Sequence, residues 1–95
     1  MSTNKIVCYL YTVFDEKKKL IDFVKYYKKY RSGLNHKLVI CFKLLNIKEV
    51  TKIRKYLKKI NYIEFIDPSK NNDWDFGSYK RVSKVFYDKD ILFLN

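Results

Sequence analysis

The segment from Asp73 to Tyr79 carries the residue types in this chain that are best suited to chemistry. It reads Asp-Trp-Asp-Phe-Gly-Ser-Tyr. Asp73 and Asp75 form an Asp-x-Asp string, in which two carboxylates can hold a divalent cation against a diphosphate. Gly77 would let a ligand approach the backbone closely, and a helix that begins here offers free N–H groups to an anion. The segment therefore indicates a ligand that bears phosphate.

Each of these features also has a purely structural interpretation. Asp75 and Ser78 can cap a helix. Gly77 can relieve packing against a sheet, and Trp74 can be a partly buried anchor instead of a stacking surface for a base. A three-residue string with two fixed positions also arises by chance. Whether residues 73–79 form a binding site therefore depends on the helices and strands that position them.

Four apolar runs and three amphipathic stretches alternate along the chain. The runs at residues 6–11, 38–42, 62–66 and 91–95 are rich in β-branched and aromatic side chains, as expected of strands covered on both faces. Between them, apolar residues recur at steps of three and four, which predicts helices. This alternation predicts an α/β fold with a four-stranded parallel sheet and three right-handed crossover helices, in a single domain over residues 1–95.

The three helices are predicted from their ends and their apolar faces. Asp15 is expected in the first turn of the first helix, where the helix dipole favours an acid, and Gly33 is expected to end that helix. Asn46 with Glu49 three residues later predicts a capping box for the second helix. The inner faces are expected to hold Leu20, Phe23, Val24, Tyr27 and Tyr30, then Ile47, Val50, Ile53, Leu57 and Ile60, and finally Phe76, Tyr79, Val82 and Phe86.

Ligands of open parallel sheets bind beyond the carboxyl ends of the strands. In this chain the predicted strands end at Tyr11-Thr12, Lys43, Asp67 and Asn95. The crossovers should bring these ends to one common rim, together with the segment that contains Gly77. Lys43 or Lys80 is expected to supply positive charge to phosphates at that rim.

Composition limits the function classes without choosing one. The net charge of +11 invites a nucleic-acid interpretation, but only 3 of the 21 basic residues are arginine, and the excess of lysine is typical of an AT-rich genome. Cys8 and Cys41 are too few for a disulfide framework and are expected to be buried in a cytoplasmic protein. No apolar run is long enough for a membrane span. His36, the only histidine, is expected to be a solvated loop residue.

Two segments in the last third of the chain resemble a known family. Asp75, Gly77 and Tyr79 match an Asp-x-Gly-x-Tyr turn, and residues 91–95 match a strand that reads roughly Ile-Leu-Phe-Leu-Asn. Both are similar to the first half of GT-A-fold glycosyltransferases, particularly the family 2-like and rhamnan-synthesis-type bacterial proteins. The strand ends at residues 11–12 and 42–43 agree more weakly.

This resemblance implies a Rossmann-like half with strand order 3-2-1-4 that binds a nucleotide-sugar. The binding residues that it implies, with the charges expected above, are Tyr11, Thr12, Lys43, Asp73, Asp75, Gly77, Tyr79 and Lys80. The family's metal-binding Asp-x-Asp follows the strand that here ends at Asn95, so the string at residues 73–75 comes one helix too early. No metal ligand or catalytic residue is therefore assigned. A divalent cation, Mg²⁺ or Mn²⁺, is expected only in a complete enzyme, and this chain is expected to be a truncated domain without activity of its own.

Two other functions stay open. A basic module without enzymatic activity could bind nucleic acid or a partner protein, with Tyr26, Tyr27 and Tyr30 as a stacking platform on a lysine-rich helix. Alternatively, the last strand would carry a bare edge and an apolar face, which another copy of the chain or a second chain could cover.

Overall fold

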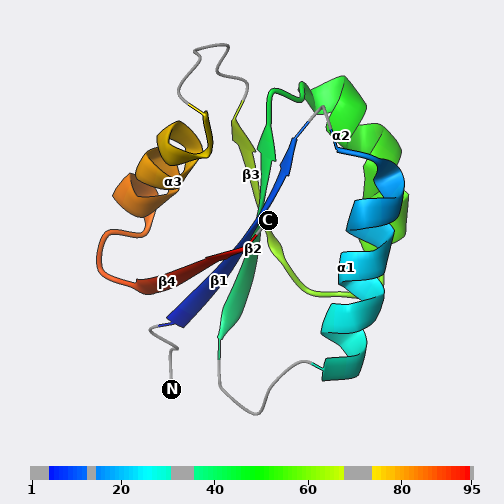
Figure 1. Ribbon diagram of the computed structural model, residues 1–95, viewed down its shortest axis with the longest axis horizontal. Coiled ribbons are helices and arrows are strands. Elements are labelled where there is room, and N and C mark those ends of the chain that lie inside the picture. The colour runs from blue at the N-terminus through cyan, green and yellow to red at the C-terminus, as the bar shows by residue number, and fades with distance from the viewer. Residues whose placement is uncertain (1–4, 13–14, 31–35, 68–73, 95) are drawn as a thin grey trace.

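A sheet lies between two layers of helices (Figure 1). The computed structural model describes residues 5–12, 15–30, 36–67 and 74–94. The elements in chain order are β1 (Lys5–Thr12), α1 (Lys17–Tyr30), β2 (Lys37–Lys43), α2 (Ile47–Ile53), the 3₁₀ helix η1 (Arg54–Leu57), β3 (Ile63–Asp67), α3 (Trp74–Val85) and β4 (Asp90–Leu94). Helices α1 and α2 cover one face of the sheet, and α3 covers the other.

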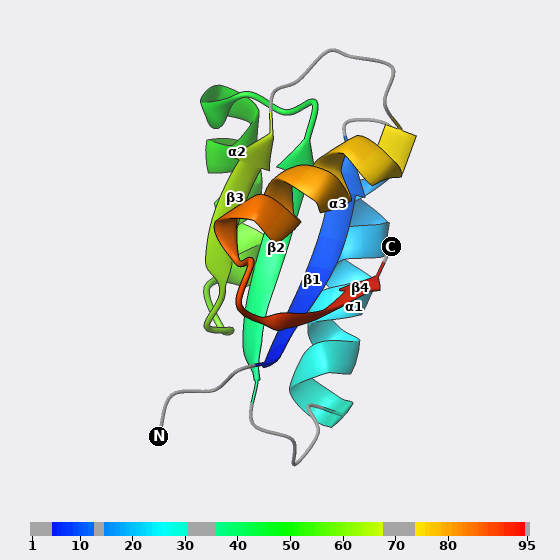
Figure 2. The same cartoon turned by 90° about the vertical axis from the view of Figure 1, so that its left-hand side faces the viewer.

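The four strands are all parallel, in the order β3-β2-β1-β4, which confirms the predicted fold class. Strand β1 pairs with β2 from Ile6–Lys37 to Thr12–Lys43. Strands covered on both faces need apolar residues at successive positions, and every residue of β2 after Lys37 is buried. The crossover that carries α3 lies on the face opposite α1, and Figure 2 shows α3 lying across that face.

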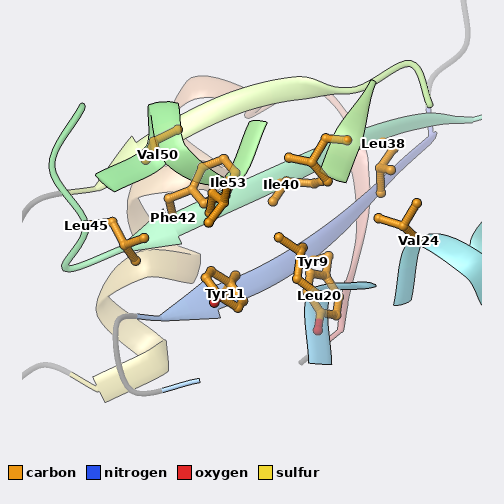
Figure 3. Packing of buried hydrophobic residues seen from close by; sticks show 11 residues of the cluster. Tyr9, Tyr11, Leu20, Val24, Leu38, Ile40, Phe42, Leu45, Val50 and Ile53 are labelled. Atoms are coloured by element: carbon orange, nitrogen blue, oxygen red, sulfur yellow. The ribbon is translucent and has the colours of Figure 1, made fainter. Parts of the chain in front are cut away.

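Alternate residues of β1 and β2 build the larger core, between the sheet and the layer of α1 and α2. Phe42 is fully buried at its centre. The ring of Tyr9 stacks on that of Phe23 in α1, with the ring centroids 3.8 Å apart. Figure 3 shows most of the buried side chains gathered along β1 and β2. The buried members are Tyr9, Tyr11, Leu20, Val24, Leu38, Ile40, Phe42, Leu45, Val50, Ile53 and Leu57.

The intervening strand residues face α3 and form a smaller core. Val82 of α3 is buried in one cluster with Cys8 and Cys41, and the ring of Tyr79 lies 4.2 Å from that of Phe93 in β4. Both cysteines are free and buried, as predicted. Burial raises the pKa of each thiol to about 12. These thiols therefore stay protonated and unreactive at neutral pH.

Helix α1 begins at Lys17, so the prediction that Asp15 occupies its first turn is wrong. The carboxylate of Asp15 instead accepts a hydrogen bond from the N–H of Thr12 at 2.9 Å. It also forms an ion pair with Lys19 at 3.2 Å. Asp15 thus holds the turn between β1 and α1 and lies outside the helix. Gly33, the predicted end of the helix, lies outside the described residues.

The capping box of α2 is confirmed. The side chain of Asn46 accepts the N–H of Glu49 at 2.9 Å, and the Glu49 carboxylate accepts the N–H of Asn46 at 3.5 Å. Ile47 is 58% exposed, so its predicted place on the inner face is wrong. The α-helix also does not continue to Ile60 as predicted, because the chain passes into η1 at Arg54. The inner residues Val50, Ile53 and Leu57 are buried as predicted.

His36 is better anchored than the sequence suggests. Its Nε2 lies 2.7 Å from the hydroxyl of Tyr27 in α1, and the two rings meet edge to face with centroids 5.7 Å apart. The side chain is partly buried, so the prediction of a solvated loop residue is wrong. The contact ties the start of β2 to the last turns of α1.

Candidate functional site

Polar residues occupy the carboxyl ends of three strands on the α3 face of the sheet. Thr12, Lys43 and Asp67 are paired in register across β1, β2 and β3. Because Tyr11 and Phe42 belong to the core under α1 and α2, the alternation of side chains turns Thr12 and Lys43 to the opposite face. Lys43 and Asp67 are only 4% and 3% exposed. Two charged groups therefore lie sheltered from water at this end of the sheet.

Asp67 connects the end of β3 to α3. One oxygen of its carboxylate, Oδ2, accepts hydrogen bonds from Ser78 Oγ at 2.8 Å and from Arg81 Nε and Nη2 at 2.9 and 2.6 Å. Ser78 is fully buried, whereas the side chain of Arg81 is 32% exposed. Hydrogen bonds and an opposite charge offset the cost of burying a carboxylate. The network therefore fixes the middle of α3 to the carboxyl end of β3.

The turn after β2 is strained and well held. Leu44 has a φ of 65°, in the left-handed region that costs a non-glycine residue about 1–2 kcal/mol. Its N–H donates to the carbonyl of Asp67 at 2.8 Å, which secures this conformation. Strained backbone held in this way is common beside binding sites. The turn directs Leu45 toward a groove at the end of the sheet.

This groove, of about 640 Å³, opens on the face where β1 ends and α1 and α2 begin. We call it the Tyr56 groove. Tyr11 at the end of β1 and Leu45 after β2 place it at the carboxyl end of the sheet. Its lining residues are Tyr11, Lys17, Leu45, Glu49, Thr51, Lys52, Ile53, Lys55 and Tyr56.

The Tyr56 groove combines positive charge with an aromatic ring. Lys17 Nζ lies 5.8 Å from the centroid of the Tyr56 ring, and Lys55 Nζ lies 5.2 Å from it. Lys52 adds a third ammonium group, and Glu49 is the one carboxylate among the lining residues. That carboxylate already accepts the N–H at the start of α2. The groove therefore favours an anionic ligand with a flat, apolar portion.

Tyr11 lines the groove from the sheet side, at the end of β1. It is 4% exposed, and its hydroxyl donates to the carbonyl of Asp15 at 3.3 Å. Burial, with a smaller contribution from the charge of Asp15, raises the pKa of Tyr11. The phenol therefore stays neutral and serves as a fixed wall of the groove.

The residues that the sequence nominated do not share one rim, because the sheet separates them. Tyr11 lies in the Tyr56 groove, whereas Thr12 and Lys43 lie on the face covered by α3, whose first turns carry Gly77. Lys43 is buried, Tyr79 packs on Phe93, and Lys80 is exposed on α3. Asp73 lies outside the described residues; Asp75 lies in α3, but its side chain is not described. The structure thus brings Tyr11 together with a set of lysines that the sequence did not nominate.

Sequence reasoning missed Ser78 and Arg81 as partners of Asp67, and it missed Tyr56. A signal existed for the first two, since they stand three residues apart and so share one side of a helix. That side also carries Val82, which is buried. Tyr56 gave no such signal, because it lies in η1. There the chain is a 3₁₀ helix, whose period differs from that of the predicted α-helix.

The described ranges offer neither a metal site nor a membrane span. Within them, no group of three or more His, Cys, Asp or Glu side chains is placed to hold a metal ion. None of the helices in the described part of the chain combines the length and the apolar character needed to cross a bilayer.

Comparison with family models gives no match, and neither do comparisons with curated proteins and with solved structures. The family resemblance in the sequence therefore stays a prediction, and the function has to be inferred from the geometry of the described residues.

Proposed function

We propose that this chain is a glycosyltransferase-like protein that binds a nucleotide-sugar in the Tyr56 groove. The observation that carries the proposal is the placement of an aromatic ring and three lysines at the carboxyl end of a parallel sheet in the order 3-2-1-4. That end is where α/β sheets bind nucleotides. The volume of about 640 Å³ is within the range of small-molecule sites.

Each part of the ligand has a counterpart in the groove. The nucleoside base stacks on the Tyr56 ring, and Leu45 and Ile53 offer it an apolar surface. The diphosphate lies among the ammonium groups of Lys17 and Lys52, which act as point charges toward phosphate oxygens. The proposal is one of binding, and no catalytic residue is assigned.

The lysines outnumber the possible cation ligands in this groove. Its lining includes a single carboxylate, that of Glu49, and this group is engaged in the capping box. Mg²⁺ is usually bound through one or two carboxylates together with the substrate phosphates. We therefore assign the neutralisation of the diphosphate to the lysines of the groove.

Tyr56→Ala should weaken nucleotide-sugar binding by roughly 5- to 150-fold, because stacking of a base on an aromatic ring contributes about 1–3 kcal/mol. UDP-, GDP- and dTDP-sugars are titrated while amide chemical shifts are followed. The expected shifts concentrate at Lys17, Leu45 and residues 49–56. Tyr87→Ala is the matched control, since this ring is 85% exposed and does not line the groove. Absence of shifts at millimolar ligand, or equal losses in both variants, would contradict the proposal.

We infer a cytoplasmic setting for this binding. The thiols of Cys8 and Cys41 are buried on one face of neighbouring strands and form no disulfide. Free cysteines are typical of reducing compartments.

The edge strand β4 supports a separate proposal, association with a second copy of the chain. In the described sheet, β4 pairs with β1 on one side only. Its Leu92 is 60% exposed and its Leu94 is 37% exposed, on the face shared with Val7 and Tyr9. Antiparallel pairing of two β4 strands about a two-fold axis would continue the sheet and place the leucines of the two copies side by side.

Leu92→Lys should abolish this association, because a charge on an edge strand opposes strand pairing. Light scattering at high protein and salt concentration is expected to give a dimer for the unchanged chain and a monomer for the variant. High salt is needed since the net charge of +11 keeps two copies apart. Val85→Lys, at a 58% exposed site on α3, should leave the dimer intact. A clean monomer of the unchanged chain contradicts this second proposal.

A further inference from the structure

A second groove, of about 460 Å³, runs between α1 and η1. We call it the Lys28 groove. It has five lysines and no acidic residue among its lining residues. The lining consists of Ile21, Val24, Lys25, Lys28, Lys55, Tyr56, Lys58 and Lys59.

The two grooves are neighbours. Lys55 and Tyr56 line both of them, so the Tyr56 ring lies where they meet. Together they gather seven lysines on one face of the molecule: Lys17, Lys25, Lys28, Lys52, Lys55, Lys58 and Lys59. This arrangement differs from a uniform excess of lysine, because Glu49 is the only acidic residue among the lining residues of both grooves.

We propose that the two adjacent grooves together bind single-stranded nucleic acid, with phosphates on the lysines and a base stacked on Tyr56. The lysines from Lys17 to Lys28 extend over about 16 Å of α1, at a rise of about 1.5 Å per residue. A single nucleoside diphosphate cannot contact charges spread over that length, whereas several successive phosphates of a strand can.

The chemistry of the lining favours a single strand over a duplex. Proteins that bind single strands combine a positive groove with aromatic rings on which exposed bases stack. Tyr56 supplies the ring, and Ile21 and Val24 supply an apolar strip beside the lysines. A duplex presents only its phosphates at such a surface and would leave the ring unused.

Strand binding can be separated from nucleotide-sugar binding. It depends on lysines that line only the Lys28 groove, above all Lys25 and Lys28 of α1. Replacing these two lysines should therefore weaken binding of a strand and leave binding of a nucleotide-sugar unchanged.

The test is fluorescence anisotropy of a labelled oligothymidine and a labelled oligouridine, each about 15 nucleotides long, over a range of salt concentration. For single strands, the logarithm of the binding constant falls with the logarithm of salt by about 0.7 for each neutralised phosphate. Four neutralised phosphates thus give a slope of about −3. The double variant Lys25→Gln and Lys28→Gln should reduce the slope to roughly −1.5 and weaken binding at low salt by 10-fold or more.

The matched control is the double variant Lys80→Gln and Lys84→Gln. It removes the same charge from exposed positions of α3, on the opposite face of the sheet. This control should retain the slope and the affinity of the unchanged chain. Equal losses in the two double variants would show that net charge alone attracts the strand, and that result overturns the proposal.

Two competitors test the kind of ligand. A duplex of the same length and a polyglutamate of matched charge should each displace the labelled strand poorly. Equal displacement by the duplex would remove the role of exposed bases, and equal displacement by polyglutamate would identify an acidic protein as the partner. Either outcome overturns the proposal, while nucleotide-sugar binding measured on separate samples without the strand reports independently on the Tyr56 groove.

Discussion

Arg81→Met is expected to lower the free energy of unfolding by about 2–3 kcal/mol. The substitution removes two of the hydrogen bonds and the opposite charge that Asp67 Oδ2 receives. Asp67 is 3% exposed, so water cannot replace the lost partner. Removing one partner of a buried pair costs about 3–5 kcal/mol. The expected loss is smaller here because Arg81 itself is 32% exposed.

The pair of Arg54 and Glu64 provides the matched control. Its two hydrogen bonds, at 3.0 and 2.7 Å, resemble those of Arg81 in number and length. However, Arg54 is 41% exposed and Glu64 is 24% exposed, so water screens this pair and Arg54→Met should cost much less stability than Arg81→Met. Urea denaturation of Arg81→Met and Arg54→Met measures both losses. Equal losses would show that the burial of Asp67 does not determine the strength of its ion pair.

Predicting the sheet from sequence succeeded because the signal is redundant. The run at residues 38–42 is short, rich in β-branched residues and apolar at every position, as expected of a strand covered on both faces. Once such runs alternate with helices, the handedness of crossovers leaves few arrangements. The order 3-2-1-4 came from the family resemblance, and the structure has that order.

Predicting the site was harder because it depends on which face of the sheet each side chain occupies. Tyr11 and Thr12 are adjacent in the chain, yet alternation sends them to opposite faces. The residues at the strand ends do not reveal which of them lie on the same face, because the sequence does not say which helix covers which face of the sheet. The expected common rim is therefore correct for the backbone and wrong for the side chains.

The grooves depend on a second feature that sequence patterns do not resolve. An α-helix has 3.6 residues per turn and a 3₁₀ helix has 3.0, so the change at Arg54 rotates every later side chain. Tyr56 and Lys55 consequently line both grooves, where a continued α-helix would present other residues. Hydrophobic spacing located the buried Leu57 but not the residues beside it.

Ile47 illustrates the same difficulty at the start of α2. Its spacing to Val50 fits an inner face, but the capping box makes it the first residue of the helix. The later turns of α2 pack on the sheet, whereas the first turn extends past it. Ile47 is therefore 58% exposed. Burial at a helix start thus depends on the neighbouring elements and not on periodicity alone.

Phe42→Ala should destabilise the fold more than Arg81→Met does, with a loss of about 3–5 kcal/mol in the free energy of unfolding. Phe42 is fully buried in β2, and the ring of Tyr11 meets it edge to face with centroids 6.4 Å apart. Removing the ring leaves a cavity that two paired strands cannot close without losing their register. For a domain of 95 residues, whose total stability is about 5–14 kcal/mol, the variant should lie close to unfolding.

Ile47→Ala is the control, since it also shortens an apolar side chain but at a 58% exposed position. Alanine favours the helix slightly more than isoleucine does, so the expected change lies within about 0.5 kcal/mol. Thermal and urea unfolding, followed by circular dichroism, measure both variants. A loss below about 1 kcal/mol for Phe42→Ala would mean that neighbouring side chains refill the site.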